Sequence, residues 1–247
     1  MSGHSKWSTI KRQKGANDAK RGQAFTKAGN ALTVAAREGG GNPDSNFKLR
    51  LAIDAARAVN MPKENIERAI TRATGTSGEK SLEEVIYEGY GPAGVAIMID
   101  AVTDNKIRTT SEIRSLLERA GGSLGGPGSV NYLFKATSAI DVKAADPDQV
   151  FLAAADAGAE DVEQNGESVT VYTVPQKLEE VKEKLRAAGF EVTGWEVSKK
   201  AASQVAVNDP KQAETVLNLV NRLEDLDDVQ KVYANFDISE EILEKVT

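Results

Sequence analysis

The sequence predicts an α+β protein of three domains: an N-terminal helical bundle and two α/β, ferredoxin-like two-layer domains. Apolar residues recur at helical spacing through the first 80 residues, and short strand-like runs alternate with helices afterwards. From residue 135 the order is strand–helix–strand–strand–helix–strand, which is typical of the split βαβ plan. A helix and a strand remain beyond that unit and would complete an earlier sheet, so the middle domain is predicted to be discontinuous. The predicted domains are residues 1–80, residues 81–134 with 206–247, and an inserted domain at 135–205.

The first domain is predicted to contain three helices preceded by an extended basic arm at residues 1–16. The helices are expected to begin near Asn17, after Ser45 and at Pro62 as first helical residue, and to end at Gly39, near Ala58 and at Gly75. The second helix is apolar around most of its circumference. Arg50 and Arg57 either pair with Asp54 along this helix or contact nucleic acid, for which they are weaker candidates than the arm.

The other two domains are predicted from strand runs and amphipathic helices. The middle domain has strands at Val85–Tyr87, Val95–Ile99, Val130–Phe134 and Val229–Ala234, and helices at Asn105–Ala120 and Pro210–Leu226. The inserted domain has strands at Ala139–Val142, Asp161–Gln164, Val169–Val174 and Glu191–Val197, and helices at Pro147–Ala157 and Gln176–Ala188.

Charge is distributed very unevenly along the chain. The formal net charge is −6, yet the first thirty residues hold seven Lys and Arg against a single acid, Asp18. A cationic end on an anionic body indicates a protein that docks on a polyanion through one face. The predicted nucleic-acid-binding residues are Lys6, Trp7, Lys11, Arg12, Lys14, Lys20, Arg21 and Lys27.

Two points about this arm stay open at the level of sequence. Trp7 either stacks on an unpaired base or wedges into a groove, or it folds back as a hydrophobic plug on the helical bundle. The arm as a whole either contacts phosphate or is a solvated tail. Lys and Arg contact phosphate without reading sequence, so the pattern does not separate DNA from RNA.

Residue types argue against an enzyme, a cofactor or a metal centre. The chain has no cysteine and one histidine, His4, which excludes cysteine nucleophiles and leaves a zinc site or a Ser-His-Asp triad without enough partners. Gly89–Gly94 matches G-x-G-x-x-G, but strands flank it on both sides, so it is predicted to be a hairpin and not a nucleotide site. Hydrolysis by paired acids is neither favoured nor excluded.

Two further features concern location and partners. No apolar run approaches the roughly 18 residues of a membrane-spanning helix, and a cytoplasmic protein is the simplest interpretation. An acidic turn at residues 224–228 is either a solvated surface turn or a site for a partner or a divalent ion.

Short motifs in a fixed order resemble one family along essentially the whole chain. They are Gly3–Trp7, Asp18–Gly22, Phe25–Lys27, Ala35–Gly41, Tyr87–Pro92, Asp104–Lys106, Gly128–Val130, Ala157–Asp161 and Glu224–Gln230. On these residues the chain is similar to the YebC family, bacterial proteins described as probable transcriptional regulators, with relatives among mitochondrial translational activators of cytochrome c oxidase. Family members often carry a bulkier stretch where Ala28-Gly29-Asn30 stands, and the low helix propensity of Gly29 and Asn30 predicts a kink or loose packing there.

The resemblance implies a three-domain architecture with a cleft between domains, where a protein partner could bind, and no catalytic residue set. Two functions then compete: a DNA-binding transcriptional regulator, and a ribosome-associated factor that contacts rRNA and aids translation. Against sequence-specific DNA binding, no helix is rich in the Arg, Asn and Gln of a recognition helix. A scaffold that binds only proteins is a third class, but it leaves the basic arm unexplained.

Overall fold

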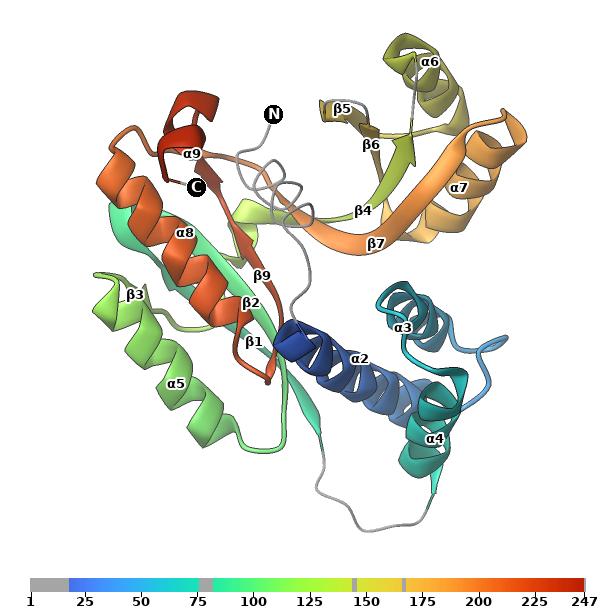
Figure 1. Cartoon of the computed structure of the whole chain (residues 1–247), viewed down its shortest axis with the longest axis horizontal. Coiled ribbons are helices and arrows are strands. Elements are labelled where there is room, and N and C mark those ends of the chain that lie inside the picture. The colour runs from blue at the N-terminus through green and yellow to red at the C-terminus, as the bar shows by residue number, and fades with distance from the viewer. Residues whose placement is uncertain (1–17, 76–81, 144–145, 166–167, 247) are drawn as a thin grey trace. The chain divides into compact units, whose positions relative to one another are not determined.

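The computed structural model describes residues 18–75, 82–143, 146–165 and 168–246. These residues form two compact units (Figure 1). The insert unit is residues 132–204, and the main unit joins the preceding described residues to 205–246. The N-terminal helices are followed by two α/β domains, as the sequence predicts, and the middle one is completed by residues that follow the insert.

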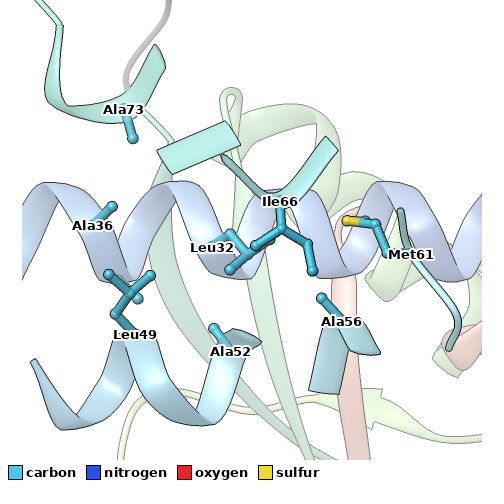
Figure 2. Close-up of a cluster of buried hydrophobic side chains, with 9 residues drawn as sticks. Leu32, Ala36, Leu49, Ala52, Ala56, Met61, Ile66 and Ala73 are labelled. Atoms are coloured by element: carbon cyan, nitrogen blue, oxygen red, sulfur yellow. The ribbon is translucent and has the colours of Figure 1, made fainter. Parts of the chain in front are cut away.

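Three helices open the main unit: α2 (Asp18–Gly39), α3 (Phe47–Ala58) and α4 (Lys63–Thr74). Figure 2 shows part of the buried cluster that they share, in which Leu32 of α2 faces residues of α3 and α4. The cluster consists of Leu32, Ala35, Ala36, Leu49, Ala52, Ala56, Met61, Ile66 and Ala73. Helix α2 continues through Gly29 and Asn30 without interruption, because Ala28 and Ala31 on either side pack against this cluster.

Asn46 joins the end of α2 to the start of α3. Its side chain accepts a hydrogen bond from the Leu49 amide (3.0 Å) as the N-cap of α3. The Asn46 side-chain NH₂ group donates to the carbonyl oxygens of Ala35 (2.7 Å) and Gly40 (2.9 Å). Asn46 is buried, so these bonds satisfy backbone groups that water does not reach at both helix ends.

The middle domain is a four-stranded sheet in the order β3-β1-β2-β9. Its strands are β1 (Glu83–Tyr90), β2 (Ala96–Thr103), β3 (Ser123–Leu124) and β9 (Val229–Ala234). Helices α5 (Lys106–Arg119) and α8 (Pro210–Glu224) lie side by side along the sheet (Figure 1). The short pair β8 (Val205–Ala206) and β10 (Phe236–Asp237) and the terminal helix α9 (Glu240–Val246) complete the main unit.

The insert unit has the split βαβ plan that the sequence predicts. Its antiparallel sheet has the strand order β5-β6-β4-β7. The strands are β4 (Phe134–Lys143), β5 (Asp161–Asn165), β6 (Ser168–Thr173) and β7 (Glu191–Ala201), and the helices are α6 (Pro147–Ala157) and α7 (Leu178–Ala187). Ile140, Val150, Val171, Val181 and Leu185 form a buried core between the two layers.

Several predicted boundaries and contacts are wrong. Residues Val130–Phe134 are not a strand: a 3-10 turn covers Asn131–Leu133, and β4 starts only at Phe134. Pro62 is the N-cap of α4, not its first helical residue, and α8 ends at Glu224. Of the two pairings with Asp54, that of Arg57 is present at 3.5 Å. The Arg50 guanidinium instead donates to the carbonyl oxygens of Pro43 (2.7 Å) and Asp44 (3.0 Å).

Candidate nucleic-acid interface

Most of the predicted nucleic-acid-binding residues belong to the arm. Lys6, Trp7, Lys11, Arg12 and Lys14 lie outside the described residues. Lys20 is described only through its backbone, in the first turn of α2. The side chains of Arg21 and Lys27 are described, and they have different surroundings.

Arg21 is exposed near the N-terminal end of α2. Its guanidinium lies 5.6 Å from the centre of the Phe25 ring, and that ring packs against the buried cluster of the three helices. A cation above an aromatic face is weakly attracted to it, which restrains the side chain while leaving its N–H groups accessible. The partial positive charge at the start of a helix also favours phosphate there.

Lys27, two turns further along α2, makes an internal contact. Its ammonium group donates to the carbonyl oxygen of Glu224, the last residue of α8. Gln23 donates to the carbonyl oxygen of Asp225 and lies 3.3 Å from the carboxylate of Asp227. Cations are favoured at the C-terminal end of a helix, where carbonyl oxygens lack partners. Lys27 therefore holds α2 against the end of α8.

The same acidic turn, residues 224–228, is tied to the sheet on its other side. The Asp228 carboxylate accepts hydrogen bonds from Arg108 (2.6 Å), Thr109 (2.6 Å) and Thr103 (3.1 Å). The contact with Asp228, and a second with Asp104 at 3.0 Å, raise the pKa of the Arg108 guanidinium. Through these hydrogen bonds the turn connects α2, α5, α8 and the end of β2. Within the described part of the chain, no cluster of three or more acids or histidines could hold a metal ion.

The position of this turn limits where phosphate can approach. The Asp227 carboxylate lies beside Gln23 in the second turn of α2, and it repels a polyanion. The exposed Arg21 precedes that point and continues the run of cations that begins in the arm. The candidate interface therefore comprises the arm and the first turns of α2, up to Gln23.

Lys48 forms a second internal joint that the sequence did not indicate. Its ammonium group pairs with Glu38 at 2.7 Å and with Glu84 at 2.8 Å, linking α3 to the ends of α2 and β1. Partial burial lowers the pKa of Lys48, but the two carboxylates raise it more, so the net shift is upward. Glu38 and Glu84 lie far from each other in the sequence, and no local pattern relates either to Lys48. Only the fold brings the three side chains together.

The glycine-rich loop before the insert, residues 125–131, is organised by a buried carboxylate. Glu88 accepts hydrogen bonds from the amides of Gly128 (2.7 Å), Val130 (2.8 Å) and Asn131 (2.8 Å). Successive backbone amides that converge in this way form an anion-binding concavity. Because Glu88 already fills it, the loop does not offer these three amides to an external phosphate.

Gly89–Gly94 lies in the β1–β2 hairpin, as predicted. Strands precede and follow it, and a 3-10 turn at Pro92–Gly94 closes it. The Tyr90 hydroxyl donates to the carbonyl oxygen of Ser129 (3.0 Å), which adds a further link to the glycine-rich loop.

In the described residues no helix has the length and apolar character needed to cross a membrane.

The fold and the charge pattern together define a class: a helical domain with a basic N-terminal end, followed by two α/β domains of which one interrupts the other. Two family models match this chain. The TACO1/YebC protein N-terminal domain matches residues 5–76, and the TACO1/YebC second and third domain matches residues 82–236. The chain belongs to the TACO1/YebC family.

Individual relatives resemble it over nearly their whole length. A probable transcriptional regulatory protein of Trichlorobacter lovleyi is 50% identical over 247 residues and covers 100% of both chains. One of Herpetosiphon aurantiacus is 50% identical and covers 99% of this chain and 98% of its own. The crystal structure of a conserved hypothetical protein from Aquifex aeolicus superposes with a TM-score of 0.84 at 47% identity, over 92% of this chain and 94% of that one.

Proposed function

We propose that this chain is a non-enzymatic, DNA-binding regulator of transcription that acts in the cytoplasm. Its interface is the basic arm and the start of α2. The residues proposed to contact nucleic acid are Lys6, Trp7, Lys11, Arg12, Lys14, Lys20 and Arg21. Lys27 is left out because its ammonium group is bonded to the end of α8.

The observation that carries the proposal is the reversal of charge along the chain. Residues 1–80 hold fifteen Lys and Arg against seven acids, and the remainder holds sixteen against thirty. Such a molecule meets a polyanion with its basic end and turns its acidic body away. The acidic turn at residues 224–228 supports this orientation, because it places the Asp227 carboxylate beside Gln23, two residues after the exposed Arg21.

Transcription is favoured over other regulatory roles by the relatives, which are named probable transcriptional regulatory proteins. The proposed contacts are to phosphate, and such contacts give affinity without sequence information. We therefore expect binding that depends strongly on salt and weakly on DNA sequence. Base discrimination, where present, falls to Trp7 and to DNA shape.

The test is a charge reversal in the arm with a matched control. Lys6, Lys11, Arg12 and Lys14 are changed to Glu, and binding to duplex DNA is measured by fluorescence anisotropy across a salt series. The control reverses four exposed lysines elsewhere: Lys143, Lys177, Lys211 and Lys245. Both variants change the net charge equally. The arm variant should weaken binding by at least tenfold and reduce the salt slope by about 0.9 for each lost phosphate contact.

The control variant should retain most of the affinity and the full salt slope. If both variants lose affinity equally, net charge and not the arm determines binding, and the proposed interface is wrong. Crosslinking in cells, with sequencing of the DNA and RNA recovered, then identifies the nucleic acid. Enrichment at discrete promoters supports the proposal. Crosslinks concentrated on one rRNA segment, with DNA at background, replace the transcriptional role with a role in translation.

A further inference from the structure

An apolar groove opens between α3 and α4. Its volume is about 420 Å³, and its walls include Ile53, Met61, Ile66 and Ile70. Met61 and Ile66 also belong to the buried cluster of Figure 2, so the groove is an extension of that core that reaches the surface. A cavity of this size with aliphatic walls accommodates a few apolar side chains of a partner.

Cations stand at the rim of this groove. Arg57 and Lys63 line it together with one acid, Glu67, and the two cationic side chains are 70% and 86% exposed. Each has only a long contact with an acid on its own helix, at 3.5 Å, to Asp54 and to Glu67. Exposed pairs of this kind are worth little, so both cations remain able to meet an acidic partner. The lining contains no aromatic ring of the kind on which nucleobases stack.

Helix α6 of the insert unit carries the complementary chemistry. Phe151 and Leu152 are 41% and 70% exposed on its outer surface. Asp148 and Asp156, both exposed, lie four residues before and after Leu152, on the same side of the helix. The helix contains no Lys or Arg. A helix that lays exposed apolar side chains into an apolar groove is a recurring mode of recognition.

The charges of the two regions agree with this pairing. Residues 18–75 hold ten Lys and Arg against six acids, whereas residues 132–204 hold eight against thirteen. Complementary charge steers encounter and fixes the orientation of binding. A groove and a knob on different surfaces of one molecule form a head-to-tail contact between copies.

We propose that the chain self-associates, with α6 of one copy seated in the α3–α4 groove of a second copy. Leu152 and Phe151 enter the groove between Ile53 and Ile70, and the aspartates on either side of them face Arg57 and Lys63. The contact is small, so the association is weak and is expected in the micromolar range. This proposal is independent of nucleic-acid binding.

The mass of the full-length protein as a function of concentration tests it. The mass of one chain is 26.4 kDa. Sedimentation velocity between about 1 and 200 μM should show the average mass rising above that of one chain, and less so in high salt. The rise is not limited to two chains, because a head-to-tail dimer keeps a free groove and a free α6. Leu152→Arg should abolish the rise, because it places a cation against the rim cations. The matched control is Ile107→Arg, since Ile107 is 85% exposed on α5 and lies in neither surface.

A mixing experiment separates the two halves of the contact. The groove variant carries Arg57→Glu and Lys63→Glu, and glutamate at the first position of α4 is compatible with the helix dipole. Each variant alone should remain a monomer. An equimolar mixture of the groove variant and Leu152→Arg should form a one-to-one dimer, because each supplies the surface that the other lacks.

Three results would overturn the proposal. The first is a wild-type protein that stays a monomer at every concentration. Docking of α6 in the groove of its own chain would give this result too, and it would equally contradict self-association. The second is a mixture that fails to form dimers although wild type does. The third is an unchanged mass together with weaker DNA or RNA binding by the groove variant, which would assign the groove to nucleic acid.

Discussion

The ammonium group of Lys27 donates a hydrogen bond to the carbonyl oxygen of Glu224, across a sequence separation of 197 residues. A cation that the charge pattern assigns to nucleic acid is therefore a joint between the first helix and the end of α8. Its neighbour Gln23 bonds to the same turn. We therefore place the proposed boundary between nucleic-acid-binding and structural cations on α2 between Arg21 and Lys27.

This boundary predicts opposite behaviour for the two cations. Arg21→Gln should weaken nucleic-acid binding severalfold and leave the thermal stability of the protein unchanged, because Arg21 is exposed. Lys27→Gln should lower stability by about 1 kcal/mol and change affinity little, because it removes a charged hydrogen bond at a helix end. Anisotropy titrations and thermal melting of both variants provide the comparison. Equal losses of affinity would show that Lys27 also contacts phosphate.

Glu88 predicts a local loss of order in the glycine-rich loop. Glu88→Gln replaces one acceptor oxygen with an N–H group, which cannot accept the bonds that Gly128 or Val130 donate. We expect a loss of roughly 2 kcal/mol, and faster hydrogen exchange at the amides of Gly128, Val130 and Asn131. The exposed Glu118→Gln on α5 is the control and should change neither quantity. Unchanged exchange in Glu88→Gln would mean that the loop is held by other contacts.

Two glycines of α2 should respond in opposite directions to alanine. A Cβ at Gly29 would meet no atom within 4 Å, so Gly29→Ala should stabilise the protein by up to about 1 kcal/mol through helix propensity alone. A Cβ at Gly39 would lie 2.5 Å from the side-chain amide of Asn46, which must then leave its bonds with Ala35 and Gly40. Gly39→Ala should therefore be destabilising, by about 2 kcal/mol. Chemical denaturation of both variants decides the matter.

The stability of the insert unit should depend on pH through the ion pair between Lys200 and Asp161. Its ammonium group pairs with Asp161 and Glu163, both at 2.7 Å, and lies 4.2 Å from the centre of the Tyr172 ring. The hydrogen bond from Lys200 lowers the pKa of Asp161 below its ordinary value of 3.8. Stability from this pair is therefore present above about pH 4 and is lost as the pH falls through the lowered pKa.

Lys200→Met should lower the stability of the insert unit near pH 7 by roughly 1 kcal/mol and make it less sensitive to acid. The chain has two tryptophans, so a Trp7→Phe background leaves Trp195 of β7 as the reporter of this unit. Fluorescence-detected melting between about pH 2.5 and 7 gives the profile. Lys143→Met, at an exposed position, is the control. A variant whose acid profile parallels wild type would remove Lys200 from the explanation.

Elements long enough to show a periodic apolar pattern were predictable from the sequence, whereas contacts between distant segments were not. The helix at residues 105–120 and the insert follow from apolar spacing and glycine ends, and both are confirmed. Strands β3, β8 and β10 have two residues each, too few to show a period. Val130 looked like the start of a strand, but its amide, and that of Asn131, bond to the Glu88 carboxylate in place of a neighbouring strand.

The candidate site shows the same limit. The charge pattern predicts which end of the chain would meet a polyanion, because charge along the chain is read directly from the sequence. It did not show that Lys27 and Lys48 are used internally, since their partners Glu224 and Glu84 come from other elements. Nor did it show that α2 would pass through Gly29 intact, because packing of neighbouring alanines outweighs propensity there.

The interrupted middle domain sets an order of events during synthesis. Strand β2 pairs with β9, yet more than a hundred residues, including the whole insert unit, separate them in the chain. At roughly 5–20 residues per second, β2 waits about 6–25 s with one edge unpaired. The insert unit is complete before that wait ends. An apolar, growing strand edge is an aggregation hazard, so the nascent chain is most vulnerable between the emergence of β2 and that of β9.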